Sequence, residues 1–268
     1  MAFFVKKQGK LEYEVSSGIT VPHCFTTRLG GVSQGYLESL NLGIHRGDSL
    51  ENVVENYRIL GNAVGFTPEQ TVFTRQTHTD IVRVVDGSHM GEGLYREVEP
   101  ECDALVTGTP GVALCAFTAD CTPILLQDPV TGAVGAVHAG WRGTVAGIAA
   151  KTVEAMVREY GSKTENIRAA IGPNIAQCCF ETGEDVPDAL RELLGREAEA
   201  FIEPRGEKFY VDLKGANAKI LQNAGVKHVE QSCSCTACRP DRFWSHRKVG
   251  LQRGSLAAII VCKGEETK

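Results

Sequence analysis

The most apolar stretch of the chain is CDALVTGTPGVALCAFTADCTPILLQDPVTGAVGAVH, which runs from Cys102 to His138. It contains four short apolar runs, at 104–106, 112–117, 124–127 and 133–138, separated by Gly, Pro and Asp residues. Runs of this length between turn residues are typical of strands that are buried on both faces. The stretch therefore predicts the strands of a central sheet, with Cys121 in the turn between two of them and His138 at the end of another.

Patterns of helices and further strands lie on both sides of this stretch. Apolar spacing and capping residues predict helices over 48–65, 144–160, 184–194 and 213–224. Runs rich in β-branched residues predict strands over 72–74, 81–85, 167–172, 226–229 and 256–261. Because no Pro-rich or Ser-rich linker divides the chain, we expect a single domain over residues 1–268. Its expected class is α/β, or mixed α+β, with a central mixed sheet flanked by helices.

Composition narrows the classes of function. The 268 residues are 43% hydrophobic and 23% charged, as in an ordinary globular protein. A formal net charge of -5 supplies no broad basic field, so nucleic acid is not an expected partner. No apolar run reaches the roughly 18 residues that a membrane span needs, and the N-terminus lacks the charge order of a secretory leader. We therefore expect a cytoplasmic protein with reduced thiols that acts on small molecules.

Two imidazoles and one thiol lie beside apolar runs, in Gln76-Thr77-His78, Asp120-Cys121-Thr122 and Val137-His138-Ala139. His78, Cys121 and His138 would supply the three protein ligands of a catalytic zinc site whose fourth position is open. Their separations of 43 and 17 residues are too long for a local metal-binding loop, so the sheet must bring them together. Taken singly, each His could instead be an ordinary core or surface residue and Cys121 an inert buried thiol.

The same atoms permit nucleophilic catalysis. Cys121 could act as a thiolate activated by His138, with Asp120 or a backbone carbonyl orienting the imidazole. A thiolate bound to zinc is a poor nucleophile, so the two hypotheses compete for one sulfur atom. The metal content of the protein distinguishes them.

Two loops combine Arg with Gly. Arg142 lies in Gly140-Trp141-Arg142-Gly143, where a strand is expected to turn into a helix whose free backbone N–H groups favour an anion. Arg28 precedes Gly30-Gly31 in a similar but weaker pattern. In the alternative interpretation, the glycines only make turns and the arginines are solvated.

The C-terminal region holds a further group of possible ligands. Cys233, Cys235, Cys238 and His246 could form a structural zinc cluster, although a single CxxC without a second pair is a weak signal. The pattern His228-Val229-Glu230 followed by Cys235 and Cys238 superficially matches a zinc deaminase signature. Only four residues separate Glu230 from Cys235, and Ser234 replaces the expected Pro, so we reject that match.

The motifs taken together resemble the polyphenol oxidase or laccase-domain family, now described as purine nucleoside phosphorylases. They are FTTRLGGVS (25–33), NLG (41–43), QTH (76–78), DCTP (120–123), VHAGWRG (137–143), IGP (171–173), CFE (179–181) and FWSHR (243–247). The resemblance covers nearly the whole chain. It implies a single α/β domain similar to the catalytic domain of a bacterial toxin that deamidates with a Cys-His pair.

The resemblance also implies an activity and a set of site residues. His78, Cys121 and His138 would bind zinc. Copper is a second possible metal, because such proteins were earlier assigned as copper-dependent phenol oxidases. The implied reaction is phosphorolysis of adenosine, inosine and S-methyl-5'-thioadenosine, with adenosine deamination as a second activity. For that reaction we take as our own candidates Arg28 and Arg142 for phosphate, Asn41 and Gln76 for the substrate, and Asp80 and Asp120, the nearest carboxylates in sequence, for proton transfer.

Two positions depart from the family pattern. The segment Cys233-Ser234-Cys235-Thr236-Ala237-Cys238 stands where such proteins commonly show a single Cys-Thr, so its extra thiols are either inert or bind a second metal. Phe180 replaces a Tyr, a change that should leave packing intact. The edges of an α/β sheet permit a homodimer, and nothing in the chain requires one.

Overall fold

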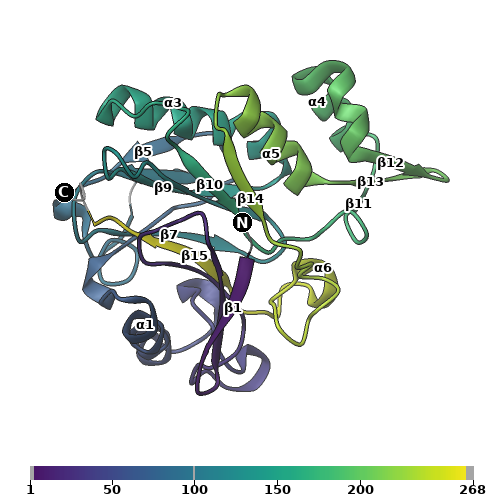
Figure 1. Ribbon diagram of the computed structural model, residues 1–268. Coiled ribbons are helices and arrows are strands. Elements are labelled where there is room, and N and C mark those ends of the chain that lie inside the picture. The colour runs from purple at the N-terminus through teal and green to yellow at the C-terminus, as the bar shows by residue number, and fades with distance from the viewer. Residues whose placement is uncertain (1–2, 99, 264–268) are drawn as a thin grey trace.

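The computed structural model describes residues 3–98 and 100–263, and its centre consists of two six-stranded sheets packed face to face (Figure 1). The first contains, in spatial order, β1 (Phe3–Gln8), β2 (Leu11–Ser16), β3 (His23–Thr26), β15 (Leu256–Val261), β7 (Ala113–Thr118) and β4 (Thr71–Phe73). The second contains β14 (His228–Gln231), β10 (Arg168–Ile171), β8 (Thr122–Gln127), β9 (Val134–Ala139), β6 (Ala104–Thr107) and β5 (Val82–Val84). Both sheets mix parallel and antiparallel pairs.

Helices cover the outer faces of both sheets. α3 (Ile148–Tyr160) and α5 (Leu213–Asn223) pack on the second sheet, and α1 (Leu50–Val64) packs on the first (Figure 1). A small third sheet is formed by β11 (Glu181–Thr182), β13 (Lys208–Val211) and β12 (Ile202–Arg205), beside α4 (Asp185–Leu194). The short helices are α2 (Trp141–Val145), α6 (His246–Val249), η1 (Gly35–Leu37), η2 (Ile44–Arg46), η3 (Pro68–Gln70), η4 (Gly87–His89) and η5 (Gly195–Phe201). In residues 3–98 and 100–263, no helix combines the length and the apolar character that crossing a membrane requires.

The predicted mixed α/β class is confirmed, and all four apolar runs are strands, β6 to β9. They do not share one sheet, because β7 pairs with β15 and β4 whereas β6, β8 and β9 lie in the second sheet. Alternate side chains of β7 enter different cores: Leu114 and Ala116 pack between the sheets, and Cys115 packs in the core beneath α1. A strand covered on both faces is apolar throughout, so its sequence does not reveal which sheet it joins.

The capping residues and apolar spacing of the sequence predicted most helix ends to within a residue or two. The Ser49 hydroxyl caps α1 by accepting from the Asn52 N–H at 3.2 Å, and Gly65 ends the helix in the left-handed region at φ 105°. The single helix expected over 144–160 is wrong: α2 begins at Trp141, and Gly147, at φ 78°, separates it from α3. The strands β1 to β3 were not predicted.

Candidate metal centre and substrate pocket

The three predicted metal ligands converge. His78 comes from the loop between β4 and β5, Cys121 from the turn between β7 and β8, and His138 from β9. Their ligand atoms all lie within 4.8 Å of one another, with Cys121 Sγ 3.9 Å from His78 Nε2. The antiparallel pairing of Pro123 with His138 carries Cys121 to the ring, which explains how residues 17 positions apart meet.

The backbone is strained at this centre. In the described part of the chain, His78 and Asp120 are the residues other than glycine with positive φ, at 64° and 96°. Such conformations cost free energy and persist where the surroundings impose them, often at functional sites. Asp120 is held by the Thr236 hydroxyl and the Arg247 N–H, which donate to its two carboxylate oxygens, each at 2.6 Å. These two hydrogen bonds fix the conformation of the turn that carries Cys121.

A carboxylate that the sequence reasoning missed organises the ligands. Asp103 is fully buried and accepts a hydrogen bond from His138 Nδ1 at 2.7 Å. It also accepts from the backbone N–H groups of Thr77, His78 and Thr79, at 3.2, 3.2 and 2.8 Å. Burial alone would raise its pKa, but His138, followed by the backbone and hydroxyl of Thr79, lowers the pKa of Asp103 to about 2. One carboxylate thereby fixes both the His138 ring and the loop that carries His78.

The ligands also perturb one another electrostatically. Burial alone would raise the pKa of Cys121, but the imidazoles of His138 and His78 lower it to about 6. Burial alone would lower the pKa of His138, but Cys121 and Asp103 raise it to about 9. Without a metal ion, a thiolate and an imidazolium are therefore the favoured pair near neutral pH.

The donor set and its surroundings fit a zinc ion. Two imidazole nitrogens and one thiolate are ordinary zinc ligands, and the Asp103 contact leaves His138 Nε2 available for a metal. A Cβ atom at Gly140 would lie 2.8 Å from His78 Cδ2 and 3.4 Å from Cys121 Sγ, so only glycine leaves the ligands their space. Three ligands that border a pocket are typical of a catalytic metal site with an open position.

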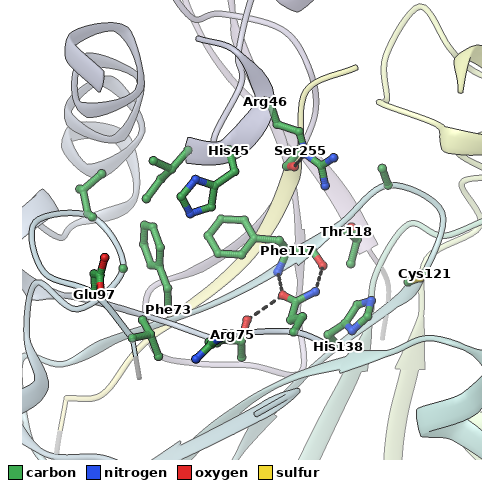
Figure 2. Close-up of a pocket in the computed structure, with 18 of the residues that line it drawn as sticks. His45, Arg46, Phe73, Arg75, Glu97, Phe117, Thr118, Cys121, His138 and Ser255 are labelled. Carbon is green, nitrogen blue, oxygen red and sulfur yellow. Dashed lines mark hydrogen bonds between the residues drawn. The ribbon is translucent and has the colours of Figure 1, made fainter. Parts of the chain in front are cut away.

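The pocket beside this centre has a volume of about 920 Å³. Phe73 and Phe117 form an aromatic wall, with ring centroids 4.8 Å apart, and His45 lies above them in Figure 2. The lining also includes the arginines Arg46, Arg75, Arg96 and Arg253. The pocket therefore combines a metal-ligand cluster, an aromatic surface and positive charge.

Two of these arginines form a candidate anion site. Arg253 Nε is buried and has no hydrogen-bond partner among the described residues. Burial and the nearby Arg46 guanidinium lower the pKa of Arg253 to about 10. The Arg46 Nε–H donates to the Ser255 hydroxyl at 3.2 Å, at the upper rim of the pocket in Figure 2. Two adjacent guanidinium groups are suited to a phosphate.

The arginines named from sequence lie elsewhere. Arg28 stacks on Trp244, 3.7 Å from the ring centroid, and donates to backbone carbonyls of Glu38 and Pro240. Arg142 is exposed and stacks on Trp141 at 4.3 Å. Neither belongs to the lining of the pocket among the described residues. The glycine loop thus leads into α2 without directing Arg142 at the pocket.

The two amides serve as supports. Gln76 lines the pocket, where its side chain accepts from the Phe117 N–H at 2.6 Å and donates to the Phe117 carbonyl at 2.8 Å. Asn41 is buried and accepts from the N–H groups of Gly43 and Ser255, two pocket-lining residues, both at 3.0 Å. Both side chains therefore position pocket walls.

The two predicted acid/base carboxylates have other partners. Asp80 forms an ion pair with Lys151, whose hydrogen bond lowers the pKa of that carboxyl. Asp120 is engaged by Thr236 and Arg247 as described above. Neither is among the pocket-lining residues that the structure describes, so the structure supplies no contact for an acid/base role of either.

The C-terminal cysteines, considered above as a weak candidate for a zinc cluster, gather with other partners. Cys235 and Cys238 gather with Cys178 and Cys179, and the four sulfur atoms lie within 4.8 Å of one another. Cys233 is exposed outside this group, and His246 Nδ1 lies 3.2 Å from the Gly250 carbonyl oxygen. Of the four residues considered as an alternative from the sequence, only Cys235 and Cys238 belong to this group, because a loop remote in sequence brings the other two thiols.

Comparison with known proteins identifies the family. Residues 22–263 match the sequence model of the family described as multi-copper polyphenol oxidoreductase laccase. A protein of Deinococcus radiodurans called purine nucleoside phosphorylase is 42% identical over 243 residues, 90% of this chain and 89% of that protein. Adenosine deaminase RL5, from an unknown prokaryotic organism, is 35% identical over 236 residues, 86% of this chain and 90% of that protein.

Among solved structures, YlmD from Geobacillus stearothermophilus superimposes with a TM-score of 0.90 at 34% identity, covering 98% of this chain and 99% of that one. The matches in sequence and structure extend over the metal centre and both sheets. The chain therefore belongs to the multi-copper polyphenol oxidoreductase laccase family, in which similar proteins are called purine nucleoside phosphorylases.

Proposed function

We propose that this chain is a zinc-dependent purine nucleoside phosphorylase that acts on adenosine, inosine and S-methyl-5'-thioadenosine, with adenosine deaminase as a side activity. The main support is one pocket in which the His78, Cys121 and His138 ligands meet an aromatic wall and paired arginines. The names of the relatives point in the same direction. A cytoplasmic location and a homodimer stay predictions.

The pocket offers a separate surface for each part of the reactants. A purine has an apolar face that suits the wall of Phe73 and Phe117. Phosphate would bind the guanidinium groups of Arg46 and Arg253, where the unpartnered Nε of Arg253 gains an acceptor. This assignment replaces Arg28 and Arg142 as the anion site. Holding phosphate beside the ribose would convert a bimolecular step into an effectively unimolecular one.

Residues of the chain would prepare the metal centre for this chemistry. Asp103 holds the proton on His138 Nδ1 and fixes the ring, while Gly140 leaves space for the ligands. When bound, a zinc ion supplies Lewis acidity and lowers the pKa of a water molecule that it contacts. Such water activation is what deamination at C6 of adenine needs.

The test is a product assay. The purified protein is incubated with adenosine with and without phosphate, and adenine, hypoxanthine, ribose 1-phosphate and inosine are measured by chromatography. We expect adenine and ribose 1-phosphate only when phosphate is present, with ribose 1-phosphate equal to the sum of adenine and hypoxanthine. Inosine should form under both conditions. Parallel reactions with inosine and S-methyl-5'-thioadenosine test the substrate range. Absence of phosphate-dependent base release from all three nucleosides would refute the proposal.

The pKa values of Cys121 and His138 favour a second candidate, a thiol hydrolase or deamidase. A thiolate beside an imidazolium is the resting state of many cysteine nucleophiles. On this alternative, activity survives removal of metal and is abolished by alkylation of Cys121. Copper-dependent phenol oxidation, suggested by the name of the family, has less support from the names of the similar proteins.

A further inference from the structure

A second cluster of metal-binding side chains lies outside the pocket. Cys178 and Cys179 lie in a turn that follows β10, and Cys235 and Cys238 lie at the two ends of a turn that follows β14. An isolated bridge between Asn174 and Cys235 holds the two segments together. Parallel pairing of β10 with β14 delivers both segments to the same end of the second sheet. Thiols about 60 residues apart are thereby assembled by the fold.

The sulfur atoms have the spacing of a tetrahedral site. Cys178 Sγ lies 3.7 Å from Cys179 Sγ and 3.6 Å from Cys238 Sγ, and the Cys179–Cys238 sulfur distance is 3.4 Å. A tetrahedron of four sulfurs with zinc–sulfur bonds of about 2.3 Å has edges of about 3.8 Å. The three distances therefore approach those of a zinc tetrathiolate and are far longer than a disulfide bond of about 2.05 Å.

The surroundings of the cluster suit bound thiolates. The Ala176 N–H donates to Cys235 Sγ at 3.4 Å, a contact that stabilises negative charge on sulfur. The Arg247 guanidinium donates to the Cys179 carbonyl at 3.0 Å and brings a positive charge to the same loop. No other pair of described segments brings four cysteine sulfurs together.

We propose that Cys178, Cys179, Cys235 and Cys238 bind a structural zinc ion, distinct from the metal of the pocket. Four protein ligands leave no open position, so this metal would join two segments and perform no chemistry. Thr236, between two of the ligands, donates to the Asp120 carboxylate at 2.6 Å and so supports the strained turn before Cys121. The structural zinc would thus keep Thr236 in position to donate to Asp120, next to the pocket ligand Cys121.

The first measurement is the zinc content of the full-length protein by mass spectrometry, after purification under reducing conditions with zinc supplied. We expect about two zinc ions per chain in the wild type and about one in Cys238→Ser, because the pocket centre and the thiol cluster would each hold one ion. The matched control is Cys233→Ser, an exposed thiol of the same loop outside the cluster, which should keep both ions. An unchanged ratio in Cys238→Ser overturns the proposal.

The second measurement leaves all four thiols intact, so it decides the question even if Cys238→Ser does not fold. The double variant His78→Ala/Cys121→Ser removes two ligands of the pocket centre. X-ray absorption of its remaining zinc should show a shell of sulfur alone at about 2.3 Å. Absence of zinc, a shell with nitrogen or oxygen, or a disulfide within the cluster in the reduced protein overturns the proposal. Neither measurement uses a nucleoside, so the proposed zinc and the proposed reaction can fail separately.

Discussion

The two ligand clusters of this protein differ in how they are built. The pocket cluster has one imidazole from a loop, one thiol from a turn and one imidazole from the end of a strand, with strained backbone at two positions, beside a cavity of about 920 Å³. The other cluster has four thiols in two turns. Three ligands beside a cavity leave room for a substrate, whereas four ligands saturate a tetrahedral ion. The pocket cluster therefore has the open ligand position that the proposed reaction needs, whereas the four-thiol cluster has the closed ligand set that suits a structural ion.

The pocket cluster depends on the thiol cluster through hydrogen bonds, whereas no described hydrogen bond makes the thiol cluster depend on the pocket. Thr236, in the turn that carries Cys235 and Cys238, and Arg247 of α6 donate to the Asp120 carboxylate, and the next residue is the pocket ligand Cys121. The pocket cluster has its own support in Asp103, whose described hydrogen bonds reach no residue of the two cysteine turns. Damage to the cysteine turns should therefore weaken the pocket, whereas damage to the pocket ligands should leave the cysteine turns intact.

The largest effect is expected from Cys121→Ala. The variant should lose the pocket metal and nucleoside turnover, because a catalytic metal contributes several kcal/mol, or on the order of 1,000-fold in rate. Zinc content and the rate of adenine release measure both losses. Cys262→Ala, at a buried thiol remote from the pocket lining, is the control for the loss of a sulfur atom. Zinc-independent turnover by Cys121→Ala would exclude the pocket ligand set and the thiol mechanism together.

A smaller effect is expected from Asp103→Asn. An amide nitrogen would replace one of two oxygens that accept from His138 Nδ1 and from the loop of residues 77–79. Loss of such a support lowers metal affinity by about 10- to 100-fold. Competition with a zinc chelator measures the affinity.

The control for this substitution is Asp188→Asn on the exposed surface of α4, where only a contact with Arg191 is lost. It should leave the affinity unchanged. Equal zinc affinities in wild type and Asp103→Asn would show that the carboxylate does not orient the ligand.

Phosphate binding tests the choice between the arginines. Removing a charged hydrogen-bond donor costs about 1.5–3 kcal/mol, so Arg253→Gln should raise the KM for phosphate by about 10- to 100-fold. Arg142→Gln changes an exposed guanidinium that stacks on Trp141 and should leave this KM unchanged. Phosphate-dependence curves of both variants provide the measurement. A raised KM for phosphate in Arg142→Gln and an unchanged one in Arg253→Gln would instead support Arg142 as the anion site.

The sequence predicted the pocket ligands because each lies beside an apolar run. It could not place Asp103, since a single Asp before the run 104–106 has the same pattern whether it is buried or exposed. It could not find Arg253 either, because the contact with the pocket depends on how β15 pairs with β3 and β7. The thiols of the second cluster were visible as a CxxC-like segment, but their partners come from another loop. Local patterns thus identified ligand types, whereas pairing of distant strands determined which residues meet.

The smallest expected effect is a shift in the reactivity of Cys121 in metal-free protein. The positive His138 stabilises the thiolate, so the rate of alkylation should rise as the pH increases through about 6. In His138→Ala the cation is absent, and the midpoint should move upward toward the ordinary thiol value of about 8.5.

Alkylation by iodoacetamide, followed at Cys121 by peptide mass spectrometry between pH 5 and 9, gives both midpoints, with Cys233 as an exposed reference thiol in the same samples. Because metal and alkylating agent compete for one sulfur, added zinc should protect Cys121 above this midpoint and leave Cys233 reactive. If Cys121 in both proteins had the same midpoint as Cys233, the imidazole would not be charged beside the thiol, and the thiol-nucleophile alternative would lose its physical basis.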